Sequence, residues 1–136
     1  MKKTMIFSVL FMLCCLGAMA QGFDAGKLKN GLWRLTKHHA NEMRTLSFTD
    51  SIKHDTYWIF WKGKWSSSSH DHPYYLSNII PQAFDFSKVG KGESGRYFVE
   101  WNDKLNEVLS LEIIYLSDSY LKFKNDCGDV LIYRKE

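Results

Sequence analysis

Cysteine and proline are both scarce in this sequence, which has three cysteines and two prolines among 136 residues. Cys14 and Cys15 lie in an apolar stretch near the N-terminus, so Cys127 is alone in the rest of the chain. A lone cysteine excludes a disulfide within that part, although small exported domains often depend on disulfides. The fold must therefore rest on a hydrophobic core, which a chain of this length can supply.

The sequence also lacks a strong excess of charge of either sign. It has 18 lysines and arginines against 15 aspartates and glutamates, and loss of Lys2 and Lys3 with an N-terminal leader would leave 16 against 15. A protein that binds nucleic acid concentrates basic residues on one face, and this sequence has no such cluster. We therefore expect no nucleic acid among its partners.

Long apolar runs are rare as well, and the only one lies at the start of the chain. An apolar segment, 5–16, follows a lysine pair and precedes Ala18-Met19-Ala20. A charged start, a short apolar segment and an A-x-A site are typical of a secretory signal peptide, which we place at residues 1–20. The segment is too short for a membrane-spanning helix, which takes about 20 apolar residues. We expect residues 21–136 to form one exported domain, periplasmic or extracellular, with no membrane span.

Apolar and polar residues alternate through the C-terminal third of the chain. Four segments there read as strands joined by short polar turns: 96–101, 107–116, 121–124 and 130–134. In the longest of them, the odd-numbered positions from Leu109 to Tyr115 are apolar, whereas Ser110 and Glu112 lie on the opposite face. Short strands with this spacing are typical of an antiparallel meander that has one apolar face.

The earlier part of the chain predicts further strands, over four segments: 32–36, 45–49, 56–62 and 64–68. A serine-rich stretch, 66–73, reads as a polar loop, and residues 88–95 read as a glycine-rich loop beside the barrel mouth. The region 74–86 is ambiguous because Pro81 interrupts any strand or helix. About eight short strands and no sustained helical period predict an all-β fold, a small antiparallel up-and-down β-barrel.

Both ends of this domain resemble the lipocalin family, in particular small lipocalin-like proteins exported by Bacteroides-type bacteria. The resemblance rests on a G-x-W motif, Gly31-Leu32-Trp33, and on closing segments at 116–123 and 131–134. It implies a barrel that binds a small ligand. It also implies that Trp33 plugs the closed end and that Arg134 packs across it, where a cation–π contact is physically sensible. The family's central T-D-Y motif is not evident.

Aromatic density is the feature that bears most directly on function, because tryptophan and tyrosine cluster on both faces of the segment 56–62. A non-catalytic carrier of a small apolar or amphipathic ligand would line its entrance from two strands. The ligand-binding residues predicted in this way are Tyr57, Ile59, Trp61, Tyr97, Val99 and Trp101. If Trp58 and Phe60 lie exposed on the outside, the alternative is a filled barrel that binds or inhibits a protein partner.

Motifs for metal binding or catalysis are weak. His70 and His72 are candidate zinc ligands, but in the predicted polar loop they are expected to be solvated. Cys127 lies between acidic neighbours that disfavour its thiolate, so it is a poor nucleophile. Residues 90–95 match G-x-G-x-x-G, but a strand-like segment follows them where a dinucleotide site requires a helix. We therefore predict a protein that is not an enzyme and has no metal or cofactor.

Overall fold

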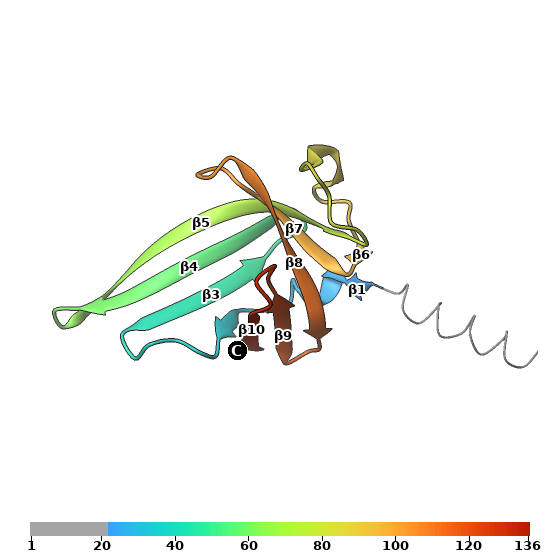
Figure 1. Cartoon of the computed structure of the whole chain (residues 1–136). Helices are drawn as coiled ribbons and strands as arrows, with labels where there is room; N and C mark the ends of the chain where they lie inside the picture. The colour runs from blue at the N-terminus through green and yellow to red at the C-terminus, as the bar shows by residue number, and fades with distance from the viewer. Residues whose placement is uncertain (1–21) are drawn as a thin grey trace, which may run out of the picture.

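Eight strands pair in chain order and close into a barrel (Figure 1). A computed structural model describes residues 22–136, and the predicted signal peptide lies outside these residues. The elements are β1 (Phe23–Asp24), η1 (Ala25–Lys27), β2 (Trp33–Leu35), β3 (Glu42–Phe48), β4 (Ile52–Trp61), β5 (Lys64–Ser77), η2 (Phe86–Lys88), β6 (Ser94–Gly95), β7 (Tyr97–Asn102), β8 (Glu107–Leu116), β9 (Tyr120–Lys124) and β10 (Val130–Lys135).

Each barrel strand is antiparallel to its neighbour, and β10 pairs with β2 to close the ring. Closure leaves the barrel without an exposed edge. The prediction of an all-β, up-and-down antiparallel barrel of about eight strands is therefore confirmed. The described part of the chain holds two short 3-10 helices, η1 and η2, and neither could traverse a bilayer.

The two ends of the barrel differ in construction. The separate two-stranded sheet of β1 and β6 lies at one end, which we call the closed end. At the other, the open end, β3, β4 and β5 continue past the remaining strands as a long arm (Figure 1). The arm ends in the turn between β4 and β5, at Lys62 and Gly63.

The prediction of a polar loop over 66–73 is wrong, because these residues belong to β5. The ladder with β4 is continuous from the Ile52–Pro73 pair to the Trp61–Lys64 pair. Serine favours turns over strands, but pairing with a neighbouring strand overrides so weak a preference. Most of these side chains are exposed and stay hydrated on the arm.

The glycine-rich segment lies at the closed end, not beside the barrel mouth as predicted. Its last two residues form β6, where Gly95 pairs with Phe23. A Cβ atom on Gly95 would lie 2.4 Å from the backbone nitrogen of Ser77, so the close approach of two backbones requires glycine there. No helix follows the motif, since β7 begins at Tyr97.

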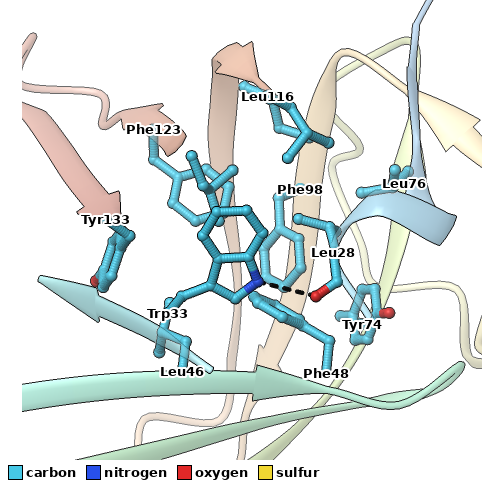
Figure 2. Packing of buried hydrophobic residues seen from close by; sticks show 12 residues of the cluster. Leu28, Trp33, Leu46, Phe48, Tyr74, Leu76, Phe98, Leu116, Phe123 and Tyr133 are labelled. Carbon is cyan, nitrogen blue, oxygen red and sulfur yellow. Dashed lines mark hydrogen bonds between the residues drawn. The ribbon is translucent and has the colours of Figure 1, made fainter. Parts of the chain in front are cut away.

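A single aromatic-rich core fills the barrel toward the closed end (Figure 2). Its buried members are Leu28, Trp33, Leu46, Phe48, Tyr74, Leu76, Phe98, Ile113, Leu116, Leu121, Phe123 and Tyr133. Trp33 is fully buried, and its indole Nε1 donates a hydrogen bond to the carbonyl oxygen of Leu28 at 2.9 Å. This bond fixes the chain that leads into β2 against the core.

The cation beside Trp33 is Lys135, and the expected contact with Arg134 is wrong. Lys135 pairs with Trp33 across the β10–β2 ladder, and its Nζ lies 5.0 Å from the centre of the indole ring. Arg134 is one residue away and exposed, because successive side chains on a strand point to opposite faces.

Candidate functional site

The inner face of the barrel changes from apolar to charged on the way to the open end. Four charged residues each lie two residues from a core residue or pair directly with one: Arg44 on β3, Lys53 and Asp55 on β4, and Glu100 on β7. Residues in such positions share a face, so all four side chains point into the barrel. Lys53, Asp55 and Glu100 are buried, and Arg44 is half-buried. We call these four residues the charged layer.

The charged layer consists of two ion pairs that touch each other. Arg44 donates from Nε and Nη2 to the two carboxylate oxygens of Asp55, at 3.0 and 2.6 Å. Lys53 Nζ lies 2.5 Å from Glu100 Oε2 and 3.7 Å from Asp55 Oδ2. Two positive and two negative charges balance, which is what permits charges to be buried at all.

The pKa of Asp55 is lowered within the charged layer, and the pKa of the neighbouring phenol of Tyr133 is raised by burial. Burial acts to raise the pKa of Asp55, but the hydrogen bonds and charge of Arg44, with help from Lys53, bring it below its ordinary value. Burial raises the pKa of Tyr133 to about 12, and the negative charge of Asp55 and Glu100 adds to that effect while Arg44 opposes it.

An open cup of about 510 Å³ lies beside β3, between that strand and the segment 36–41. Its lining residues are Leu35, Lys37, His38, His39, Glu42, Met43, Arg44 and Tyr57. Leu35, Met43 and Tyr57 supply apolar surface, and the basic and imidazole side chains supply hydrogen-bond donors. A mostly preformed hollow that combines apolar walls with a few polar groups is typical of small-molecule sites.

Arg44 belongs both to the charged layer and to the wall of the cup. A guanidinium carries five N–H donors in a rigid fork. Asp55 occupies the edge formed by Nε and Nη2. The other edge, which includes Nη1, can receive a second carboxylate or phosphate in the same two-pronged manner. Arg44 is therefore an anion-binding group that is already held in position.

The structure places Tyr57, Ile59 and Trp61 on one face of β4, the face that carries the charged layer. Tyr57 pairs with Arg44 and lines the cup. A hydrogen bond to Glu42, with a smaller effect of burial, raises the pKa of the Tyr57 phenol. Ile59 and Trp61 lie farther out along the arm and are exposed.

The other predicted trio, Tyr97, Val99 and Trp101, faces away from the barrel interior. These residues alternate on β7 with Phe98 and Glu100, which point inward. The two trios therefore lie on opposite faces of the sheet, and the structure does not bring them together.

Val99 is nevertheless fully buried, because the connection between β5 and β7 covers the outside of the sheet. The ring of Phe84 from that connection lies 5.1 Å from the ring of Tyr75 and 5.9 Å from that of Trp101. Phe86 lies 5.5 Å from Trp101. This outer cluster explains why the outer face of β7 is apolar.

Trp58 and Phe60 lie on the outer face of β4, as the alternative hypothesis of a protein-binding barrel requires. Phe60 is exposed, whereas Trp58 is half-buried. The indole Nε1 of Trp58 is buried and has no hydrogen-bond partner within residues 22–136.

The two histidines proposed as weak metal ligands lie on the inner face of β5, and Asp71 between them points outward. His72 Nδ1 is 3.2 Å from the carbonyl oxygen of Trp101, and His70 Nε2 is 3.4 Å from Lys104 Nζ. Asp71 accepts from His54 on the outer face at 2.5 Å. No group of three metal-ligating side chains occurs in the described residues.

The pair of His54 and Asp71 lies next to two hydroxyl groups, yet it lacks the geometry of a catalytic triad. Thr56 Oγ1 and Ser69 Oγ hydrogen-bond each other at 3.0 Å. In a triad the second nitrogen of the imidazole bonds the nucleophilic hydroxyl, and an oxyanion hole lies beside it. This group lies on the outer surface of β4 and β5, away from the cup.

The charged layer and the wall of the cup were missed from the sequence, apart from Tyr57. The signal was present, since Arg44 lies two residues before Leu46, and Lys53 and Asp55 lie four and two residues before Tyr57. Charged residues at inward positions of a strand point to a polar interior.

Comparisons with known proteins add no relative. No family model matches the chain, and no curated protein or solved structure matches it significantly. The likeness of Gly31-Leu32-Trp33 to a lipocalin motif therefore stays a prediction.

Proposed function

We propose that the protein is an exported, non-catalytic, lipocalin-like carrier that holds a small amphipathic ligand with an acidic head group in the cup at the open end. The observation that carries this proposal is the position of Arg44. Its guanidinium is bound by Asp55 on one edge, and Arg44 is also one of the residues that line the cup. A preorganised donor loses little conformational freedom on binding, which favours affinity.

The shape of the interior supports an amphipathic ligand over a wholly apolar one. Core side chains fill the closed half of the barrel, and the charged layer lies between that core and the open end. A ligand must therefore bind in the outer half, where Leu35 and Tyr57 offer apolar contact and Arg44 offers charge. A volume of about 510 Å³ falls in the range of small-molecule sites.

The mechanism is capture and shielding without a chemical step. Lys37, His38 and His39 add positive or protonatable groups around the cup, and Glu42 is the acidic group among the lining residues. The acidic head would bind to Arg44, and the apolar tail would lie along Tyr57 and Leu35. Charge-assisted hydrogen bonds of this kind contribute about 1.5–3 kcal/mol each.

Two measurements test the proposal. Native mass spectrometry of protein purified from its own host, followed by organic extraction, should reveal a co-purified acidic amphipath. Calorimetric titration with dodecanoate should show binding, and dodecanol, which has the same tail without the charge, should bind more weakly. Arg44→Lys keeps the charge but loses the second fork, so it should weaken dodecanoate binding by about tenfold or more.

Arg34→Lys is the matched control, because Arg34 lies on the outer face and pairs with Glu136. It should bind dodecanoate like the unaltered protein. Equal binding of dodecanoate and dodecanol, or an unchanged affinity in Arg44→Lys, would contradict the proposed site. A protein that binds neither compound and co-purifies with none would favour the alternative of a filled, protein-binding barrel.

A further inference from the structure

The arm ends in an exposed aromatic and basic turn that the proposed carrier function does not use. We call residues 59–65 the aromatic tip. Four of its large apolar side chains are exposed, by 38% for Ile59, 41% for Phe60, 68% for Trp61 and 47% for Trp65. A single exposed apolar residue is ordinary, but a contiguous group of this kind marks an interaction surface.

The aromatic tip ends in a tight two-residue turn. Lys62 and Gly63 both have positive φ angles, 49° and 80°, as in the two-residue type I′ turn of a tight hairpin. Asparagine or glycine is preferred at the first of these positions, so a lysine there carries backbone strain. Strained backbone of this kind concentrates at functional positions.

Apolar side chains cover both faces of the aromatic tip. Phe60 and Trp65 lie on the outer face with ring centres 5.3 Å apart, while Ile59 and Trp61 lie on the inner face. The barrel body does not cover them, because the arm projects past it (Figure 1). Because the hairpin is apolar on both faces, only a partner or medium that contacts both faces at once can cover its apolar side chains.

The charge of the aromatic tip has one sign. Lys62 and Lys64 are exposed, and no aspartate or glutamate occurs in the stretch 56–70. Anionic lipid headgroups attract such lysines, with each basic side chain near the surface contributing about fivefold in partitioning. Tryptophan prefers the level of the headgroups, because one end of the ring is apolar and the other can hydrogen-bond.

We propose that the aromatic tip docks the protein on an anionic lipid surface. Trp61 and Trp65 insert among the headgroups, and Lys62 and Lys64 bind the lipid phosphates while their stems lie along the indoles. A convex two-residue turn fits a fluid bilayer better than a protein, since a stable protein interface needs about 800 Å² of complementary surface on each partner. The residues that line the cup include the segment that leads into β3, a strand of the arm, so docking through the aromatic tip brings the cup near the lipid.

The test is sedimentation of the purified protein with sucrose-loaded vesicles. Phosphatidylcholine vesicles with about one-third phosphatidylglycerol should bind the protein, and pure phosphatidylcholine should bind it much more weakly. Lipids brominated on the acyl chain near the headgroup should quench Trp61 and Trp65 fluorescence. Lys62→Asn with Lys64→Gln should weaken partitioning by roughly thirtyfold, and Asn suits the turn.

Trp61→Ser with Trp65→Ser should abolish both the sedimentation with vesicles and the quenching by brominated lipids. The matched control is Tyr115→Ser with Tyr120→Ser, two exposed aromatics near the closed end, which should leave binding unchanged. No binding of the unaltered protein to anionic vesicles overturns the proposal, as does binding that survives the tryptophan changes. Concentration-dependent dimers that need Trp61 and do not bind vesicles would overturn it in favour of a second copy of this chain.

Discussion

Lys135 Nζ lies 5.0 Å from the centre of the fully buried indole ring of Trp33, and the two residues face each other across the ladder that closes the barrel. The first and last strands of the barrel are thus joined by side chains as well as by backbone hydrogen bonds. A cation held over an indole contributes about 0.5–2 kcal/mol, with the larger values where the pair is desolvated.

We expect Lys135→Met to lower the free energy of unfolding by about 1 kcal/mol. The matched Arg134→Met should change it by less than about half of that, because exposed substitutions rarely cost more. Thermal unfolding by circular dichroism measures both, and the lysine variant should melt several degrees lower. A larger loss of stability in Arg134→Met than in Lys135→Met would contradict a stabilising contact between Lys135 and Trp33.

The strands of the C-terminal third were predictable because local signals agree there. In 107–116, alternation and flanking turn residues point to the same strand, and β8 has those bounds. In 66–73 the local and tertiary signals disagree. Four consecutive serines, Ser66 to Ser69, favour a loop locally, and pairing with β4 decides for a strand.

The candidate site was less predictable, because alternation assigns residues to two faces without telling which face is inside. On β7 the outer face is apolar, since the connection that carries Phe84 covers it, whereas the inner face carries Glu100. The apolar character of Tyr97, Val99 and Trp101 therefore does not tell whether they face a cavity or the outer cover. The expectation for Arg134 came from the lipocalin resemblance, and the neighbouring residue Lys135 is the one on the face of Trp33.

The charged layer predicts a strong asymmetry between breaking and replacing an ion pair. Glu100→Gln leaves Lys53 buried, with only a longer 3.7 Å contact to Asp55. We expect a loss of about 3–5 kcal/mol, because an unpaired buried charge is costly. The double change Lys53→Met with Glu100→Leu should recover most of the loss. Urea denaturation gives both values.

Glu112→Gln is the control for that series. Glu112 pairs with Arg96 at 3.3 Å on the surface, where ion pairs contribute at most about 1 kcal/mol. If Glu100→Gln cost no more than Glu112→Gln, Lys53 would have to reach water or another carboxylate. The charged layer would then not be closed to solvent.

Two buried tyrosines predict a loss of stability at alkaline pH. Burial raises the pKa values of Tyr74 and Tyr133 to about 12, and the Tyr74 hydroxyl donates to the Thr49 carbonyl oxygen at 2.6 Å. An unfolded tyrosine ionises near pH 10, about two units lower. The stabilisation from both phenols is therefore complete below about pH 10 and is lost as the pH rises toward 12.

Ultraviolet titration should show that these two phenols ionise late, after the exposed tyrosines. In Tyr74→Phe the late phase should shrink, and stability should fall less steeply with pH above about 10. Ionisation of every tyrosine in a single step near pH 10, with the fold intact, would contradict the burial of both side chains.

The close approach of Gly95 to the backbone of Ser77 predicts that a methyl group at this position destabilises the closed end. A Cβ atom there would lie 2.4 Å from the nitrogen and 2.7 Å from the oxygen of Ser77, and both are backbone atoms that cannot turn aside. We expect Gly95→Ala to cost about 1–3 kcal/mol, as overpacking does. In Gly26→Ala the added methyl meets the flexible carboxylate of Asp24 at 3.1 Å, so this control should unfold close to the unaltered protein.

The Gly95→Ala change should also loosen the cover over the core. Gly95 pairs with Phe23 in the sheet of β1 and β6, and the chain after β1 leads to Leu28, the hydrogen-bond acceptor of Trp33. Displacing that sheet should admit water to the indole, so acrylamide should quench an additional tryptophan in Gly95→Ala before global unfolding. If stability falls while quenching stays unchanged, the strain is absorbed within β5, and the two-stranded sheet does not protect Trp33.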